Sequence, residues 1–258
     1  MSQKERLEKM EGKKIKFSII IPAHNEEKYI GKCLDSIMAA AAPYKNQVET
    51  IVVLNRCTDR TEEIAKSYNC ITLKNEDKNL SKIRNAGAKI AKGDILITID
   101  ADTCMNKTLL AVIDHVLSTG LCIGGGVTGV FDRMSLGMAA SLTFLTIPII
   151  LKYGWISVGI FWCYRKDFEA INGFNEDILM LEDCDFAKRL FVWGLKNKKF
   201  FGTIPFAMTT SSRKFDKYGD WMFIKRPELI CAYLKETDRK HADELYYEYE
   251  NERLELKH

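Results

Sequence analysis

The tripeptide Asp100-Ala101-Asp102 has the residue types and spacing to bind a polar ligand or a cation. It directly follows residues 95–99, a short β-branched apolar run that is typical of a buried parallel strand. Open α/β sheets bind ligands at the carboxyl ends of their strands. Two aspartates in a turn need no special cause, so this pair must be weighed together with the other motifs of the chain.

A second acidic group, Glu182, Asp183 and Asp185, stands where a helix is expected to begin. A hydroxyl group that attacks an electrophilic carbon needs one general base, and a carboxylate can serve as that base. Acidic residues also favour the positive end of a helix, but three of them exceed what capping requires. The sequence therefore predicts a general base within this group.

The elements that must position these groups alternate between strands and helices. The expected strands are residues 17–21, 50–54, 70–73 and 95–99, and the helices between them include residues 26–41 and 80–91. This rhythm predicts an α/β fold with a mostly parallel, doubly wound sheet. Beyond it we expect an edge strand at 127–131, irregular chain at 154–164, a helix at 182–193 and a strand at 198–204.

Composition narrows the class of protein. The 258 residues suit one α/β domain, and a formal net charge of +3 does not indicate a nucleic-acid partner. The eight cysteines form no C-x-x-C pair, which argues against a zinc site and for buried free thiols. Residues 1–16 form a charged leader without the apolar core of a signal peptide, so we expect a cytoplasmic protein.

Polar residues also follow the first two strands. Residues 17–21 run into Pro22-Ala23-His24-Asn25-Glu26, and residues 50–54 are followed by Asn55. Asn55 carries both a donor and an acceptor, so its amide can pair with the edge of a nucleobase.

Taken in order, these motifs resemble the family-two glycosyltransferases, which have the GT-A fold. The matching segments are I-I-I-P-A-H-N-E-E, N-R-C-T-D-R-T, I-R-N-A-G, I-D-A-D and G-F-N-E-D-I-L-M-L-E-D-C-D, within residues 17–210. The resemblance implies a GT-A domain over 17–210, with a nucleotide-binding half at 17–105 and an acceptor half at 106–210. Residues 211–258 are then a loop and helical tail packed on that domain.

The resemblance also implies roles for individual residues in binding a nucleotide-diphosphate sugar. The nucleoside contacts are Pro22, His24, Glu26 and Asn55, and Arg84 lies in the family's A-R-N-x-G motif. Asp102 would bind Mg²⁺ or Mn²⁺, while Asp100 and Ala101 would contact the donor, Asp100 at the ribose or in the outer shell of the metal. Arg213 is the late basic residue that would reach the diphosphate.

On the acceptor side, the resemblance makes Asp183 the base and places Glu182 at the acceptor hydroxyl, with Asp185 as the alternative base. One-base displacement implies an inverting hexosyltransferase of class EC 2.4. His24 replaces the family's usual tyrosine and Asn55 its usual aspartate, and these departures leave the base open between uracil, the first choice, and guanine, the second.

The segment 136–151 is strongly apolar and carries no charge. It predicts a core or acceptor-side helix. The alternative is an interfacial helix that contacts the inner face of a membrane, which would suit a lipid-linked acceptor. Two rival functions are a catalytically silent nucleotide-sugar-binding scaffold and a nucleotidyltransferase, although the latter would need a glycine-rich phosphate loop after the first strand.

Overall fold

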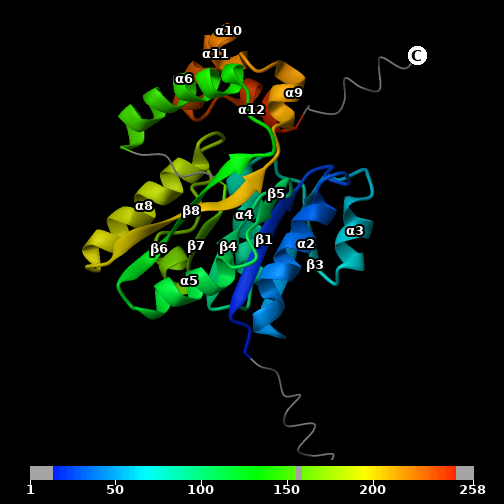
Figure 1. Cartoon of the computed structure of the whole chain (residues 1–258), viewed down its shortest axis with the longest axis vertical. Coiled ribbons are helices and arrows are strands. Elements are labelled where there is room, and N and C mark those ends of the chain that lie inside the picture. Colours follow the sequence, from blue (N-terminus) through cyan, green and yellow to red (C-terminus); the bar gives the residue numbers. More distant parts are fainter. Residues whose placement is uncertain (1–13, 155–158, 248–258) are drawn as a thin grey trace, which may run out of the picture.

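The computed structural model describes residues 14–154 and 159–247 of the chain (Figure 1). Most of the expected leader, residues 1–13, lies outside the described residues, as do residues 155–158 and 248–258.

Eight strands form one mixed sheet in the order β3-β2-β1-β4-β7-β6-β8-β5. The strands are β1 (Phe17–Ala23), β2 (Val48–Asn55), β3 (Ile71–Asn75), β4 (Ile95–Thr98), β5 (Thr103–Met105), β6 (Cys122–Phe131), β7 (Phe161–Tyr164) and β8 (Phe200–Thr210). The first four are all parallel, with Phe17 of β1 opposite Val48 of β2 and Ile95 of β4. The α/β, GT-A-like fold class expected from the sequence is confirmed.

The other half of the sheet corrects two expectations. Residues 127–131 are no edge strand, because β6 is an interior strand between β7 and β8. Part of the segment expected to be irregular forms β7, antiparallel to β4 and β6. The sequence predicts too short a strand here because glycines have low strand propensity. In the structure they allow two backbones to pack closely, since a Cβ on Gly125 would lie 1.9 Å from the carbonyl oxygen of Gly202.

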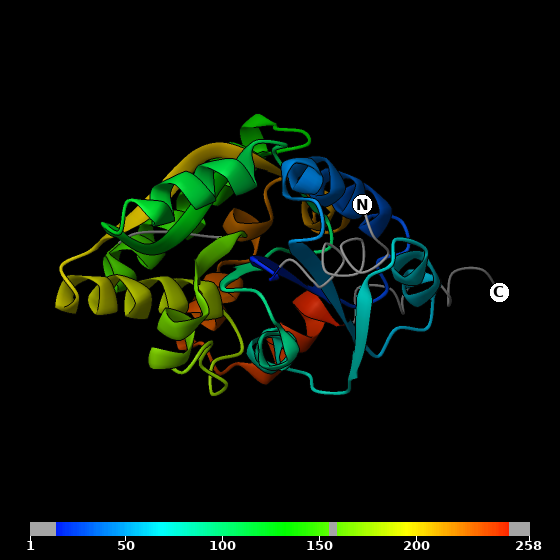
Figure 2. The same ribbon diagram turned by 90° about the horizontal axis from the view of Figure 1, so that it is seen from below.

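Helices cover both faces of the sheet (Figure 2). The helical segments are α2 (Ile30–Ala41), η1 (Ala42–Tyr44), α3 (Thr61–Ser67), α4 (Leu80–Ile90), α5 (Leu109–Ser118), α6 (Leu136–Tyr153), α7 (Arg165–Ala170), α8 (Glu182–Lys196), α9 (Arg213–Tyr218), α10 (Met222–Lys225), α11 (Pro227–Lys235) and α12 (Arg239–Tyr246). One core cluster joins α2, α3 and α5 to the sheet, and a second joins α4, α7 and α8 to its other face. All eight cysteines are free thiols, and Cys33, Cys122, Cys163 and Cys184 are buried, as expected.

A third core cluster lies apart from the sheet. It packs α6 against α10, α11 and α12 through residues such as Met138, Leu229, Tyr233 and Leu245. In Figure 1 this helical cap lies beyond the carboxyl ends of the parallel strands, at the top of the view. The cap therefore faces the edge of the sheet where α/β proteins bind ligands.

Candidate functional site

A pocket opens between the carboxyl ends of the parallel strands and the helical cap. Its lining combines residues at and just after the ends of β1, β2 and β4 with residues from the start of α4, the start of α9 and the end of α12: Pro22, Ala23, His24, Asn25, Glu26, Asn55, Leu80, Ile83, Asp100, Ala101, Asp102, Arg213, Lys214, Leu245, Tyr246 and Tyr247. Every residue expected to bind the donor lies in this lining except Arg84.

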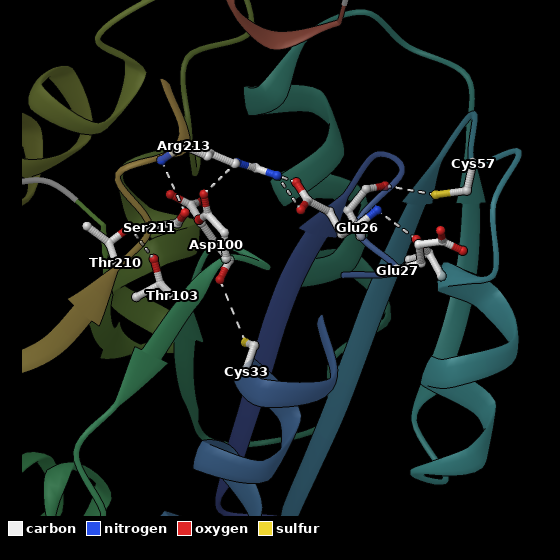
Figure 3. Close-up of polar contacts among 12 residues, drawn as sticks. Glu26, Glu27, Cys33, Cys57, Asp100, Thr103, Thr210, Ser211 and Arg213 are labelled. Atoms are coloured by element: carbon white, nitrogen blue, oxygen red, sulfur yellow. Dashed lines mark hydrogen bonds and ion pairs between the residues drawn. The ribbon is translucent and has the colours of Figure 1, made fainter. Parts of the chain in front are cut away.

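Arg213 ties two distant acidic residues together in the pocket (Figure 3). Its terminal nitrogens each lie 2.6 Å from an oxygen of Glu26, and its Nε lies 3.0 Å from Oδ2 of Asp102. The sheet explains the meeting: β5 follows Asp102 and pairs antiparallel with the end of β8, so Thr103 lies opposite Thr210 shortly before Arg213. The two threonine hydroxyls are 3.0 Å apart.

Burial sets the charge balance of this pocket. It raises the pKa of Glu26 to about 7 and raises that of Asp102, while the Arg213 guanidinium opposes both shifts. Burial also lowers the pKa of Lys214, whose Nζ lies 4.5 Å from the centre of the Tyr246 ring. Cations and carboxylates thus share a region poor in water, where a further negative charge or a metal ion would shift the balance strongly.

Arg84 joins the two acidic groups of the sequence. Its side chain is buried, with Nη2 lying 2.8 Å from Oδ1 of Asp100 and Nη1 lying 2.6 Å from Oε1 of Glu182. Its guanidinium carbon also lies 5.2 Å from the centre of the Phe174 ring. The structure therefore places Arg84 beneath the pocket, as a bridge between the donor side and the start of α8.

Asp183 lies in the first turn of α8. The preceding residue, Leu181 at the N-cap, has a φ of 62°, which is uncommon for a residue with a branched side chain. The approach to this turn is held from the cap, because the backbone amides of Leu179 and Met180 donate to the carbonyl of Glu236 at 2.7 and 3.2 Å. The position of Asp183 thus depends on contacts with a residue more than fifty positions later.

The surroundings of Asp183 suit a general base. Burial, and then the negative charge of Glu182, raise its pKa to about 7, while Arg84 opposes the shift. Such a pKa lies near the pH at which a base must both accept and release a proton. Asp185 is engaged differently, because its Oδ2 lies 2.7 Å from Nε of Arg189 one turn along the helix. The geometry favours Asp183 over Asp185.

Asn55 is buried, and its amide group is already engaged. Its Nδ2 donates to the carbonyls of Asn75 and Asp77 at 3.0 and 2.7 Å, while its Oδ1 lies 3.4 Å from Nε of Arg56. Asn55 therefore holds the loop that follows β3. The backbone oxygen of Asn55 lies 2.6 Å from Nδ1 of His24, which joins the ends of β1 and β2.

Two aromatic residues of the pocket were missed by sequence reasoning. Tyr246 and Tyr247 end α12 and line the pocket beside the strand ends. The Tyr247 ring centre lies 5.9 Å from that of His24, and the guanidinium of Arg56 lies 4.9 Å from it. The only signal was the richness of the tail in tyrosine, which cannot be told from a solvated surface helix without knowing where the tail docks.

Asp102 has the chemistry for a divalent cation, since it presents a carboxylate to the pocket next to Asp100. Within the described ranges, no three His, Cys, Asp or Glu side chains are arranged to hold a metal ion. Mg²⁺ and Mn²⁺ often bind through one or two carboxylates, with phosphate oxygens and waters completing the shell. The residues thus fit a cation that is shared with a phosphate ligand.

We expect the thermal stability of the protein to fall as pH rises from about 5 to about 7. Asp183 and Glu26 both have a pKa near 7 in the folded chain, above the ordinary values of 3.8 and 4.5. In that pH window the folded state holds protons that the unfolded chain has released, so raising the pH favours unfolding. Above about pH 7 this contribution levels off.

Melting curves of the wild type and of Asp183→Asn between pH 5 and 8 test this expectation. The variant should show a smaller decline in melting temperature, whereas Asp177→Asn, on an exposed loop, should follow the wild type. Parallel curves for the wild type and Asp183→Asn would contradict the raised pKa.

Comparisons with known proteins agree with the geometry. The family model described as glycosyl transferase family 2 matches residues 18–167. The poly(ribitol-phosphate) beta-N-acetylglucosaminyltransferase TarS of Staphylococcus aureus is 34% identical over 193 residues, which are 69% of this chain and 33% of TarS. A Methanococcus voltae enzyme named as a dolichyl N-acetyl-alpha-D-glucosaminyl phosphate glucuronosyltransferase is 29% identical over 164 residues, or 58% of this chain and 49% of that enzyme.

Solved structures share the fold. Residues 1–349 of S. aureus TarS in complex with UDP-GlcNAc superpose with a TM-score of 0.61 at 20% identity, covering 94% of this chain and 73% of that one. Glucosyl-3-phosphoglycerate synthase of Mycobacterium tuberculosis, solved with Mn²⁺, UDP and glucosyl-3-phosphoglycerate, gives a TM-score of 0.55 at 17% identity, with coverages of 84% and 80%. The family match runs from β1 into α7, more than half of the chain, and its motifs surround one pocket. The chain belongs to glycosyl transferase family 2.

Proposed function

We propose that this protein transfers a sugar from a UDP-sugar to a hydroxyl acceptor by a single, metal-assisted displacement that inverts the anomeric carbon. The observation that carries the proposal is the Arg84 bridge. It links Asp100, in the lining of the pocket, to Glu182, the neighbour of Asp183, a half-buried carboxylate whose pKa of about 7 suits a base. A donor site and a proton acceptor are thereby held in one rigid arrangement.

The nucleoside would bind at the ends of β1 and β2, near His24 and the stacked pair of Arg56 and Tyr247. Uracil is favoured and guanine is the alternative. The UDP complexes of TarS and of the mycobacterial synthase support uracil as the base. Because the side-chain amide of Asn55 binds the loop after β3, its part in base recognition would be to shape the pocket.

The diphosphate would lie near Asp102, Arg213 and Lys214. Asp102 would hold Mg²⁺ or Mn²⁺ together with phosphate oxygens, and the cation, when bound, offsets the negative charge that grows on the leaving UDP. Arg213 now neutralises Asp102 and Glu26, so binding of a cation at Asp102 would free its guanidinium to bind phosphate.

Asp183 would accept the proton of the acceptor hydroxyl. As that oxygen bonds to the anomeric carbon, the bond from this carbon to the phosphate oxygen breaks and UDP departs with the electron pair. A single displacement of this kind inverts the configuration. Glu182, held by Arg84, would orient the acceptor hydroxyl and keep Asp183 basic through its negative charge.

The acceptor would be a hydroxyl group on a phosphate-containing molecule, either a polymer or a lipid. The support is the printed activity of two relatives, one acting on poly(ribitol-phosphate) and the other on a dolichyl-linked sugar phosphate. This chain spans 33% of the length of TarS, so the acceptor of TarS is not carried over to it and the acceptor class is a proposal. We place the reaction in the cytoplasm, with contact to the inner face of a membrane.

A thermal-shift panel of UDP, GDP, CDP and dTDP, each with and without Mn²⁺, tests the donor site. We expect the largest shift for UDP with Mn²⁺, because a ligand at about one hundred times its dissociation constant stabilises the fold by roughly 2.7 kcal/mol. Asp102→Asn should lose the Mn²⁺-dependent part of the shift. Asp94→Asn, at the other end of the same strand region, should keep it.

The panel also separates the rival functions. A larger shift with GDP would replace uracil by guanine, and no shift with any nucleotide would contradict the donor site. If UDP binds with Mn²⁺ but no UDP is released from UDP-GlcNAc or UDP-glucose, the protein is a nucleotide-sugar-binding scaffold and the proposed reaction is wrong.

A further inference from the structure

Helix α6 exposes a continuous apolar face. Its exposed large side chains are Leu136 at 80%, Phe144 at 49%, Ile147 at 54%, Ile150 at 43% and Leu151 at 82%. At about 100° per residue, these positions fall within roughly one third of the circumference of the helix. Together they form what we call the α6 face.

The opposite side of the helix is packed against the cap. Met138, Ser141 and Ile149 are buried, and the Ser141 hydroxyl donates to the carbonyl of Asp220 at 2.8 Å. The helix is therefore apolar on both sides, although only one side serves the core. By length and composition α6 could cross a membrane, but its packing on α10 and α11 lays it along the surface of the protein.

An exposed tryptophan and a lysine border the α6 face, whereas Lys152 at the end of α6 is paired with Glu236. Trp221 and Ile224 are 42% and 40% exposed, and a Cβ on Gly137 would lie 2.8 Å from Nε1 of Trp221, so the indole borders the start of α6. The charged residues of α6 and α10 are Lys152 and Lys225, and neither helix contains an acidic residue. An apolar surface bordered by tryptophan and lysine is typical of proteins that lie in the membrane interface.

We propose that the α6 face, with Trp221 and Ile224, docks on the surface of an anionic lipid bilayer. The apolar side chains would enter the boundary between headgroups and acyl chains, and Lys225 would meet anionic headgroups. The exposed indole of Trp221 favours this occupant over a second copy of the chain, because tryptophan is enriched where proteins meet the membrane interface.

Docking would bring the membrane close to the proposed base. At the end of α6, Nζ of Lys152 lies 2.5 Å from Oε1 of Glu236, and the Tyr153 hydroxyl donates to the same carboxylate. Glu236 is the residue whose carbonyl holds the approach to Glu182 and Asp183. If the proposed transfer is correct, this arrangement suits an acceptor carried on a lipid; the docking itself does not depend on the reaction.

Vesicle flotation of the full chain tests the docking. The protein is mixed with vesicles of phosphatidylglycerol and phosphatidylcholine, or of phosphatidylcholine alone, without nucleotide. We expect flotation with the anionic vesicles and a roughly tenfold or greater loss of partitioning for Ile147→Glu and for Leu151→Glu, since each removes an exposed apolar side chain that docking would bury in the bilayer. Leu195→Glu, equally exposed on α8 at 59%, is the matched control and should float like the wild type.

Three results would overturn the proposal: no flotation with anionic vesicles, an equal loss for Leu195→Glu, or a dimer by light scattering that Ile147→Glu dissociates. The UDP and Mn²⁺ thermal shift of Ile147→Glu reports on folding and on the donor site separately. If Ile147→Glu keeps the UDP and Mn²⁺ shift but no longer floats, docking is supported. If the wild type itself shows no shift, the proposed function is contradicted and the docking proposal is not.

Discussion

Asp183→Asn is expected to lower the turnover number by about 10²–10⁴-fold, the range that general-base catalysis contributes. Asparagine keeps the size of the side chain but cannot accept the proton of the acceptor hydroxyl. The affinity for UDP with Mn²⁺ should stay near the wild-type value, because Asp183 does not line the nucleotide pocket. The measurement is the rate of UDP release from a UDP-sugar, with UDP affinity determined in parallel.

The pH dependence of the wild type gives a second readout. Because the pKa of Asp183 lies at about 7, the fraction of the active carboxylate form rises through neutral pH, and the rate should rise with it. Asp185→Asn serves as the control, since its carboxylate is paired with Arg189 and should matter far less. Full activity in Asp183→Asn, or a larger loss in Asp185→Asn, would make the base assignment wrong.

Arg84→Met is expected to lower the free energy of unfolding by about 3–5 kcal/mol, as removal of one partner from a buried ion pair does. Arg84 and Glu182 are only 3% and 6% exposed at their side chains, so removing Arg84 leaves a buried carboxyl group without its cationic partner. The bond to Asp100 contributes less, because that side chain is 39% exposed and water screens it. Chemical denaturation at neutral pH measures the loss.

A double variant tests whether the charge pair is the cause. Arg84→Met combined with Glu182→Gln removes both charges, so it should be more stable than Arg84→Met alone. Asp185→Asn, which breaks the more exposed pair with Arg189 and leaves the Arg189 bonds to backbone carbonyls in place, should cost much less. If the double variant is no more stable than Arg84→Met, lost packing on Phe174 and not the unpaired carboxylate explains the effect.

That Asp100, Asp102 and Glu26 share one pocket could be predicted because they follow strands with strong local patterns. Each of the three comes shortly after such a run, and parallel strands bring those ends to one edge. Arg213, which was expected to reach a diphosphate, also lies in the pocket, and its partners there are Glu26 and Asp102.

The remaining features depend on long-range packing that no local pattern records. Arg84 was expected at the donor, but its burial under the pocket is decided by how α4 meets α8. Tyr247 reaches His24 only because the cap folds back over the strand ends. The start of β6 is hard to predict because it consists of glycines, and the reason for them, the close packing of Gly125 against the backbone of Gly202, is a long-range contact.

The Glu236 contacts determine when the turn before α8 can become anchored as the chain is synthesised. Strands β1 to β5, with the pocket residues at their ends, are complete in sequence at Met105, and ribosomes lengthen chains at about 5–20 residues per second. The backbone turn that carries Glu182 and Asp183 cannot be anchored until Glu236 has been synthesised, more than fifty residues later. A nascent chain would thus hold the strand-end residues of the pocket before the Glu182 and Asp183 turn is anchored, and it could close the pocket with Tyr246 and Tyr247 only after Glu236 is in place.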